Sequence, residues 1–224
     1  SGPLYYETIM PTLPRIDYRI EKYQLTEASE TPKIAAQWQQ VINTCQQQKA
    51  GSTERLQIAM QTVDYVTSFE LPFRLMLIRA PQLIDKLRED GGIFSKSAKI
   101  NGNKRCVVYS RRADFSAPED FQYRRTYKVF RTGAEGGTTS SYTSITQQSD
   151  VPRERLRLAL SSGLLVTALD AMLFFGVQRI ASDVAIFRKQ GMRVTLLHVS
   201  AFDSMTQSVR DIPAYRADIF PIEQ

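Results

Sequence analysis

The stretch GVQRIASDVAIFRKQGMRV, residues 176–194, is the most informative part of this 224-residue chain about its fold. Its apolar side chains recur at spacings of four and three residues, so they share one face of a helix predicted over 178–190. The residues on that face are Ile180, Val184 and Phe187. Two cations and then Gly191 follow, which is typical of a helix that ends at a left-handed glycine. The stretch therefore predicts an amphipathic helix with a defined end.

Shorter helices are predicted before this stretch, and strands after it. Residues 155–162 carry closely spaced apolar side chains, and the tetrapeptide TALD at 167–170 has the form of a capping box that begins a second helix. Gly176 would make the turn into the third helix. Downstream, residues 193–199 alternate weakly and predict a strand, for which residues 212–217 would be the returning partner.

This order of elements is that of a winged helix-turn-helix domain. Residues 155–200 also resemble the small helix-turn-helix domains of phage and plasmid proteins, whose pattern is roughly "gi.r.a..i..LR..G..i". The residues that match the pattern are Gly176, Arg179, Arg188 and Gly191. Phe187 departs from it, since the family usually has leucine there. The resemblance implies the fold and DNA binding, but no particular target.

An internal repeat extends this interpretation to the first half of the chain. Residues 55–92 align without a gap onto residues 155–192, with eight of 38 positions identical. The identical pairs are Arg55/Arg155, Leu56/Leu156, Ala59/Ala159, Val66/Val166, Thr67/Thr167, Arg79/Arg179, Arg88/Arg188 and Gly91/Gly191. Two unrelated amphipathic stretches could match by coincidence, but the shared caps and the shared glycine favour a true repeat. The first copy, at 55–110, is more degenerate, with Met76 in place of the turn glycine.

A basic hairpin is predicted at the end of the first copy. Asn101-Gly102 is the preferred pair for a two-residue type I′ turn, and residues 93–100 and 104–110 would be its strands. Four cations lie on or beside the tip, namely Lys96, Lys99, Lys104 and Arg105. Such a wing suits contact with phosphates or with the minor groove, whereas a solvated hairpin with ordinary surface lysines is the alternative.

The predicted fold class is α+β, with two tandem winged helix-turn-helix lobes joined by a flexible linker. Residues 1–30 would form an extended N-terminal arm, with a short strand at 16–20. Residues 31–131 would form the N-terminal lobe, which begins with a helix capped by Thr31. Residues 132–150 are rich in Gly, Ser and Thr and predict the linker, and residues 151–224 would form the C-terminal lobe.

Several classes of protein are excluded or disfavoured. No apolar run is long enough to span a membrane. The single histidine, His198, makes a histidine metal site very improbable, and no phosphate-loop, dinucleotide-binding or nucleophile-elbow motif occurs. Two cysteines without a C-x-x-C motif favour a reducing compartment, so we expect a cytoplasmic protein. We predict no enzyme activity, no metal and no cofactor.

The charge distribution points to an anionic partner. The net charge is +6 with a pI of about 9.4, and residues 96–131 alone carry ten basic and three acidic residues. A solubilising charge without a partner is the alternative. Within this segment, FQYRRTYKVFR at 121–131 interleaves rings with cations: Tyr123 and Tyr127 could stack on bases, with Arg124, Arg125 and Lys128 on phosphates. We favour buried rings, with phosphate contact by the cations.

The first residues of each third helix are the predicted contacts to bases, because that helix enters the major groove. In the C-terminal lobe these are Gln178, Arg179 and Ser182, with Asp183 expected to position Arg179. In the N-terminal lobe the equivalents are Arg79, Gln82, Asp85 and Lys86, of which Arg79, Gln82 and Lys86 are predicted to bind DNA. Arginine would read guanine and glutamine would read adenine.

The predicted function is sequence-specific binding of double-stranded DNA, as a transcriptional regulator of a phage or plasmid. A plasmid-type replication initiator is the runner-up, since such proteins also join two winged helices in one chain. A regulator would bind a symmetric operator as a homodimer, whereas an initiator would bind direct repeats. A winged-helix protein-interaction module without nucleic acid is the third alternative. A nuclease or recombinase lacks a recognisable catalytic constellation.

Overall fold

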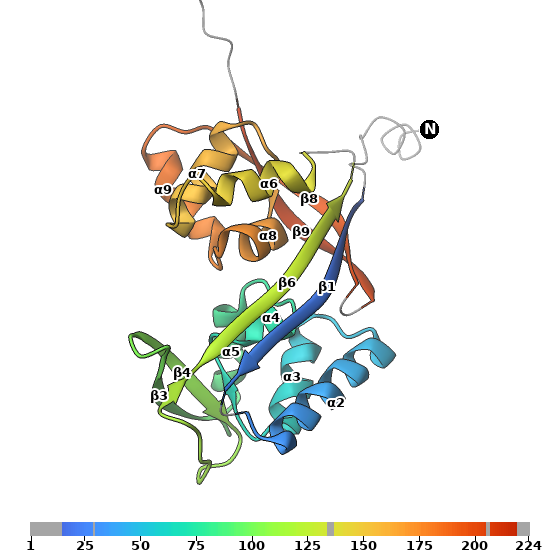
Figure 1. Cartoon of the computed structure of the whole chain (residues 1–224), viewed down its shortest axis with the longest axis vertical. Coiled ribbons are helices and arrows are strands. Elements are labelled where there is room, and N and C mark those ends of the chain that lie inside the picture. The colour runs from blue at the N-terminus through green and yellow to red at the C-terminus, as the bar shows by residue number, and fades with distance from the viewer. Residues whose placement is uncertain (1–14, 29, 134–136, 205–206, 219–224) are drawn as a thin grey trace, which may run out of the picture.

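The chain folds into an α+β structure, as predicted. The computed structural model describes residues 15–28, 30–133, 137–204 and 207–218, and Figure 1 shows how its elements are arranged. The helices are α2 (Pro32–Gln48), α3 (Ser52–Thr62), α4 (Leu71–Arg74), α5 (Ala80–Glu89), α6 (Thr139–Thr146), α7 (Pro152–Ser161), α8 (Ala168–Asp170), the π-helix η1 (Ala171–Phe175) and α9 (Ile180–Lys189). The strands are β1 (Ile16–Glu27), β2 (Val66–Thr67), β3 (Phe94–Ile100), β4 (Lys104–Ser110), β5 (Asp120–Phe121), β6 (Tyr123–Thr132), β7 (Val166–Thr167), β8 (Val194–Asp203) and β9 (Ser208–Ala217).

Two long strands, β1 and β6, form an antiparallel ribbon that crosses the molecule from one half to the other (Figure 1). A short parallel pairing of β1 with β8 makes the ribbon part of a five-stranded sheet with the order β6-β1-β8-β9-β7. The second sheet has the order β2-β4-β3-β5. Ribbon side chains enter both hydrophobic cores, with Leu25 and Tyr123 in one and Tyr18 and Val129 in the other. The ribbon therefore joins the two halves through buried contacts.

The same order of elements occurs twice. We call residues 52–110 the first repeat (α3, β2, α4, α5, β3, β4) and residues 152–217 the second repeat (α7, β7, α8 with η1, α9, β8, β9). The short strand of each repeat pairs with the last one in the same register, Val66 with Tyr109 and Val166 with Tyr215. The last helix of each repeat has a buried apolar face, which includes Ile84 and Leu87 in α5 and consists in α9 of Ile180, Val184 and Phe187, as its spacing predicts.

The first arginine shared by the two copies has the same role in both. Arg55 Nη1 donates to the carbonyl oxygen of Leu75 at 3.0 Å, and Arg155 Nη1 donates to that of Phe175 at 3.5 Å. Each arginine also donates from Nε to a carbonyl just before its own helix, Ala50 for Arg55 and Ser149 for Arg155. Each guanidinium therefore ties the start of one helix to the end of the next, which explains why both copies keep arginine here.

The capping box of the second repeat is buried and holds the ribbon. Thr167 N donates to Asp170 Oδ2 and Asp170 N donates to Thr167 Oγ1, both at 3.0 Å, as the sequence predicts. Tyr18 of β1 donates its phenolic hydrogen to Asp170 Oδ1 at 2.8 Å, and Arg131 Nε of β6 donates to the same oxygen at 2.9 Å. All four residues are buried, so the carboxylate is bound on every side.

The first repeat contains the equivalent arrangement. Thr67 and Glu70, which align with Thr167 and Asp170, exchange the same two hydrogen bonds at 2.7 and 3.1 Å, so the first repeat has a capping box as well. Tyr123 of β6 donates to Glu70 Oε2 at 3.1 Å, and Arg74 Nε donates to Glu70 Oε1 at 2.8 Å. Each box therefore receives a tyrosine from the ribbon: β1 supplies Tyr18 to the second box, and β6 supplies Tyr123 to the first.

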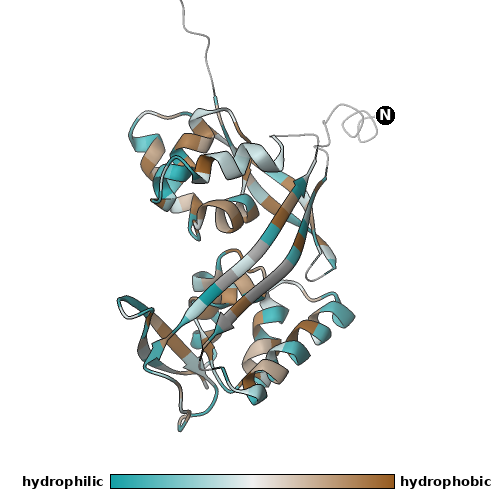
Figure 2. Cartoon of the chain, viewed as in Figure 1, coloured by the Kyte–Doolittle hydropathy of each residue, from teal (hydrophilic) through white to brown (hydrophobic). Residues whose placement is uncertain are grey.

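The helix that follows the second box changes character along its length. The predicted helix from 167 to 174 or 175 is present, but its second half is the π-helix η1. Every residue from Ala168 to Phe175 is buried, and Figure 2 shows this segment as largely hydrophobic. A helix that is apolar on all sides has to lie inside the protein.

The stretch predicted as a flexible linker contains α6. Tyr142 and Ile145, three residues apart, are buried on one face of this helix, and the Tyr142 hydroxyl donates to the carbonyl oxygen of Leu165 at 2.5 Å. A capping box at Thr138 begins the helix, and several of its hydroxyls donate to carbonyls one turn earlier. Composition alone predicts a linker, because it does not take into account that Tyr142 and Ile145 are buried.

The predicted N-terminal arm is also corrected. Residues 16–27 form β1, a full strand of the ribbon, and residues 1–14 lie outside the described residues.

The turn of the β3–β4 hairpin has the predicted conformation. Asn101 and Gly102 have φ values of +50° and +83°, and Asn103 N donates to the carbonyl oxygen of Ile100 at 3.3 Å. Because Ile100 pairs with Lys104, the loop has three residues rather than the predicted two. Gly102 N also donates to Asp120 Oδ1 at 3.1 Å, which fixes the tip to the strand that leads into the ribbon.

Candidate nucleic-acid interface

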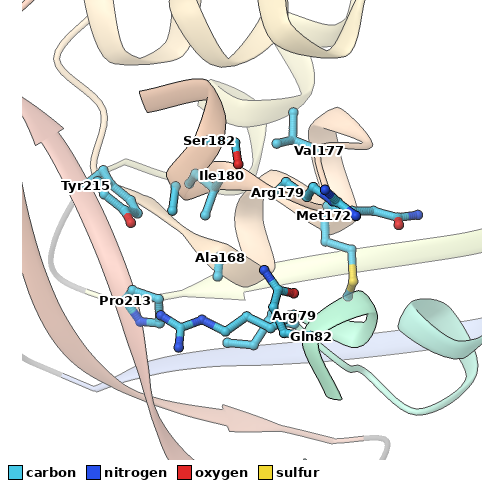
Figure 3. A pocket seen from close by; sticks show the side chains of 13 residues that line it. Arg79, Gln82, Ala168, Met172, Val177, Arg179, Ile180, Ser182, Pro213 and Tyr215 are labelled. Atoms are coloured by element: carbon cyan, nitrogen blue, oxygen red, sulfur yellow. The ribbon is translucent and has the colours of Figure 1, made fainter. Parts of the chain in front are cut away.

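The N-terminal ends of α5 and α9 share one small pocket (Figure 3). Its wall includes Arg79 and Gln82 from the first repeat, and Arg179 and Ser182 from the second. The remaining lining residues come from the turns, from α8, η1 and α9, and from β9: Ile78, Ala168, Met172, Val177, Gln178, Ile180, Ala181, Pro213 and Tyr215. The free volume is about 40 Å³, which holds only a few waters.

A larger groove continues from this pocket along the β3–β4 hairpin. It shares Gln178 and Arg179 with the pocket and has a free volume of about 330 Å³. Its other lining residues are Ser68, Phe69, Pro81, Ile84, Asp85, Ile100, Lys104, Arg105, Cys106, Val107 and Tyr109. Because two residues are common to both, pocket and groove form one cleft between the repeats, which we call the inter-repeat cleft.

Equivalent turns aim the two helices at the cleft. Gly176 ends η1 at φ +76°, and Met76 holds the equivalent position in the first repeat at φ +51°. Arg79 then takes a left-handed conformation as the N-cap of α5, with Pro81 in the first turn of that helix. Arg179 is the N-cap of α9. Arg79 and Arg179, which are equivalent residues of the two repeats, therefore both lie in the wall of the shared pocket.

The inter-repeat cleft is strongly cationic. Arg79, Arg179, Lys104 and Arg105 are all exposed, and within the described residues none of their side chains makes a hydrogen bond or an ion pair. Among the described residues that line the cleft, Asp85 carries the only carboxylate. The ends of two helix dipoles add partial positive charge at the same place. An anion is the ligand that such a surface favours.

The floor of the groove is apolar. Ile84, Ile100 and Cys106 are buried there, and the half-buried ring of Phe69 lies under Lys104 with its centroid 5.5 Å from Nζ. Burial raises the pKa of the Cys106 thiol to about 11, so this cysteine is protonated at neutral pH and is a poor nucleophile. The groove therefore offers binding surface rather than an activated catalytic group.

Seven of the predicted DNA-binding residues meet in this cleft: Arg79, Gln82, Lys104, Arg105, Gln178, Arg179 and Ser182. Lys99 pairs with Arg105 across the hairpin and so lies beside the rim. Lys86 is exposed on α5 and does not line the cleft.

The other predicted cations lie elsewhere. The Lys96 ammonium donates to the carbonyl oxygen of Phe115 at 2.5 Å and lies 4.3 Å from its ring centroid. Arg124 and Lys128 are exposed on the opposite face of β6 from Tyr123, and Lys128 lines a separate groove beside α6 and η1. The side chain of Arg125 lies outside the described residues.

One expected side-chain role is wrong, and one pair of alternatives is decided. Asp183 accepts from Arg153 Nε at 3.1 Å, so it pairs with α7 instead of positioning Arg179. Tyr123 is buried with its hydroxyl in the first capping box, so its ring cannot stack on a base. The favoured alternative, buried rings with exposed cations, holds for Tyr123 and Arg124, while the Tyr127 side chain lies outside the described residues.

The β8–β9 hairpin of the second repeat packs against the first repeat. Asp203 is completely buried, with Oδ2 at 3.8 Å from Arg55 Nη2 and 3.7 Å from Arg210 Nε. Arg55 Nη2 also donates to Ser208 Oγ at 2.7 Å, and Arg210 Nη2 donates to the carbonyl oxygen of Met76 at 2.6 Å. Burial lowers the pKa of Arg210 to about 10, and Asp203 opposes that shift. This hairpin is therefore an internal clamp, which sequence reasoning missed because its partners lie about 150 residues apart.

The described residues contain no cluster of side chains suited to a metal ion. Among the helices of the described residues, none is both long and apolar enough to cross a membrane. Comparison with models of protein families, with curated proteins and with solved structures finds no match to this chain.

Proposed function

We propose that the chain binds double-stranded DNA through the inter-repeat cleft and acts as a transcriptional regulator of a phage or plasmid. The observation that carries the proposal is the meeting of Arg79 and Arg179, two exposed and unpaired arginines at equivalent helix starts, beside Lys104 and Arg105. Uncompensated cations on one surface favour a polyanion. The repeated order of helices and hairpin supports two winged helices as the scaffold.

The residue types in the cleft suit both phosphates and base edges. A guanidinium can form two parallel hydrogen bonds to guanine or to a phosphate, and the amides of Gln82 and Gln178 can pair with adenine. Lys104 and Arg105 on the hairpin lie close enough to the groove to meet the DNA backbone beside the same site. Contacts to base edges would supply preference for a sequence, and contacts to phosphates would supply most of the affinity.

The closeness of the two helix starts limits how the DNA lies. Two helices that read successive major grooves are separated by one helical turn of DNA, about 34 Å. Arg79 and Arg179 line a single pocket of about 40 Å³, so they are far closer than that. One chain would therefore contact one short segment of duplex, and a symmetric operator would take two chains.

The proposal is tested by selecting bound sites from random duplex DNA at about physiological salt. We expect an enriched motif, and we expect Arg179→Ala to weaken binding by about 1–3 kcal/mol and to relax one base position. Arg79→Ala would act in the same way at a neighbouring position.

Lys96→Ala is the matched control, since its ammonium is held by Phe115 outside the cleft. It should leave both motif and affinity unchanged. An unenriched pool with salt-sensitive binding would indicate a non-specific DNA coat, and absence of binding even at low salt would reject DNA as the ligand and favour a protein partner.

A further inference from the structure

An approximate two-fold axis through the β1–β6 ribbon relates the two halves of the molecule. The ribbon strands are antiparallel, and each begins in one half and ends in the other (Figure 1). The start of β1 pairs in parallel with the end of β8, and β5, which leads into β6, pairs in parallel with the end of β3. Just after β8, Ser204 N donates to the carbonyl oxygen of Tyr18 at 3.1 Å. Just after β3, Asn101 N donates to that of Phe121 at 2.8 Å, so each hairpin receives the start of one ribbon strand in the same way.

The equivalence extends beyond the two repeats to the elements that precede them. One further helix leads into each repeat, α2 between β1 and the first repeat and α6 between β6 and the second. Each unit therefore runs from a ribbon strand to a hairpin, over residues 16–110 and 123–217, and its first strand reaches into the half formed by the other unit. One chain thus has the architecture of a dimer with exchanged strands.

The inter-repeat cleft follows the same symmetry. Arg79 lines the pocket together with Tyr215 of the second repeat, and Arg179 lines the groove together with Tyr109 of the first. The two tyrosines are equivalent, since each pairs with the short strand of its own repeat in the same register. Further equivalent pairs in the two walls are Ser68/Ala168, Pro81/Ala181 and Val107/Pro213. The cleft therefore consists of two equivalent subsites, each with the arginine of one repeat and a wall of the other.

The two hairpins break this symmetry. Lys104 and Arg105 of β4 are exposed, and their side chains make no hydrogen bond or ion pair within the described residues. By the register of the two tyrosines, the equivalent positions of β9 hold Arg210 and Asp211. Arg210 is held in the internal clamp, where it donates to the carbonyl oxygen of Met76, and Asp211 has the opposite charge. At these two positions only the first repeat offers free cations to a ligand.

Duplex DNA has a matching symmetry, because two-fold axes perpendicular to the duplex relate its antiparallel strands. A protein with a two-fold axis meets equivalent atoms on the two strands, and the palindromes of operators reflect this match. A guanidinium that reads a base edge pairs best with guanine. Two equivalent arginines in one cleft therefore favour a target with equivalent guanines on its two strands.

We propose that one chain reads a short duplex centre that is itself self-complementary, with Arg79 on a guanine of one strand and Arg179 on the equivalent guanine of the other. The inference rests on the proposed DNA function and adds the symmetry of its target. A longer operator read by two chains would contain two such centres. Lys104 and Arg105 would meet phosphates on one flank of the centre, since the second hairpin has no counterpart to them.

The test selects bound sites from random duplex DNA with the full chain and with Arg79→Gln, Arg179→Gln and the double variant. The unmodified chain should enrich a self-complementary centre with a guanine on each strand. Each single substitution should weaken binding to that motif by about tenfold and remove the guanine preference on one strand only. The two single variants should therefore select the same centre read from opposite strands, and the double variant should select a symmetric centre without these guanines.

Lys189→Gln is the matched control, because it makes the same change of charge at the far end of α9, on an exposed residue outside the cleft. It should leave the symmetric motif unchanged.

Affinities for shortened duplexes measure the one-sided flank. A symmetric centre can be bound in two orientations, so removal of one flank should weaken binding only about twofold, by the loss of one orientation. Removal of both flanks should weaken binding by about tenfold, because the phosphate contacts are lost. Lys104→Gln/Arg105→Gln should bind all three duplexes within about twofold of one another.

The motif of the unmodified chain tests the inference without any substitution. An enriched motif with an asymmetric centre, or single variants that keep a symmetric one, overturns the inference and leaves the proposed DNA function intact. Absence of an enriched motif, or of binding, rejects both.

Discussion

Arg55 and Arg155 illustrate how one residue acquires a second role within a repeat. Both close the same turn, but only Arg55 is fully buried and also reaches across to Ser208 and Asp203. A buried carboxylate needs compensation, because transfer of an unpaired charge out of water is costly. Asp203 obtains it from Arg55 in the first repeat and from Arg210 on its own hairpin.

Arg55→Met should be strongly destabilising. It keeps the bulk of the side chain but leaves the carbonyl of Leu75 without that donor and Asp203 without one of its cations. Loss of one partner of a buried pair typically costs about 3–5 kcal/mol. Urea unfolding measures the change. Arg157→Met, in an exposed pair with Glu154, is the control and should leave the midpoint unchanged; an equal effect of both substitutions would contradict the role of burial.

The buried tyrosines of the two boxes predict sensitivity to alkali. Burial raises the pKa of Tyr18 and of Tyr123 well above the usual 10.0, since the phenolate would lose its hydration. The unfolded chain releases these protons near pH 10 and the folded chain retains them, so stability should be constant below about pH 9 and fall as the pH rises above 10.

Urea midpoints at pH 8, 9.5 and 11 measure this loss of stability. The double variant Tyr18→Phe/Tyr123→Phe starts from a lower free energy of unfolding but should decline less steeply above pH 10, because two of the ionising groups are gone. Parallel declines in the two proteins would show that other groups cause the alkaline loss.

At the scale of elements, the turns before α5 and α9 determine the direction of these two helices. Gly176 has a left-handed conformation at no steric cost, whereas Met76 takes it with a β-carbon. Met76 is completely buried, and its carbonyl accepts from Arg210 Nη2 of the second repeat. Packing and this hydrogen bond therefore hold the first turn in a conformation that the second obtains from glycine.

Gly176→Ala should lower the free energy of unfolding by about 1–2 kcal/mol, since alanine at φ +76° is strained. Space is not the cause, because the nearest atom to an added β-carbon is Pro152 Cγ at 3.9 Å. Thermal or urea unfolding measures the loss. Gly51→Ala is the control: Gly51 has φ −75° and open space, so its effect should be much smaller.

At the scale of the whole molecule, we expect the two repeats to unfold as one unit, because ribbon side chains enter both cores. Trp38, the single tryptophan, reports on the first core, whereas Leu160 lies in the second. Leu160→Ala should lower the free energy of unfolding by about 2–5 kcal/mol and shift the Trp38 fluorescence transition by the same amount. Circular dichroism over the same urea range should coincide with it. An unshifted tryptophan transition beside a two-step loss of secondary structure would mean that the repeats unfold independently.

Local features were predictable from the sequence because they depend on neighbours in the chain. The capping boxes, the helix over 178–190, the Asn101-Gly102 turn and the 100-residue repeat all follow from spacing and residue type. Seven of the predicted contact residues also meet in one cleft: five lie at the equivalent helix starts of the two repeats, and Lys104 and Arg105 lie on the adjoining hairpin.

Features that depend on distant segments were not predictable in this way. The ribbon pairs β1 with β6 across about 100 residues, and the alternation of polar and apolar side chains along a strand does not indicate its partner. Nothing in the sequence around Asp203 indicates that its carboxylate faces Arg55 of the first repeat. Asp183 was expected to position Arg179, its neighbour in sequence, whereas its actual partner is Arg153 of α7. The burial of Tyr123 was predicted, but its hydrogen bond to Glu70 of the first capping box was not.

The parallel pairing of Ile16–Tyr18 with Ala201–Asp203 has a consequence for folding during synthesis on the ribosome. During synthesis β1 leaves the ribosome early, but it cannot complete its sheet until the residues of β8 have been translated. In the interval one edge of β1 lacks its neighbour, and an open strand edge invites pairing with other chains. We therefore expect the growing chain to depend on the speed of translation or on a holding chaperone until β8 has been made.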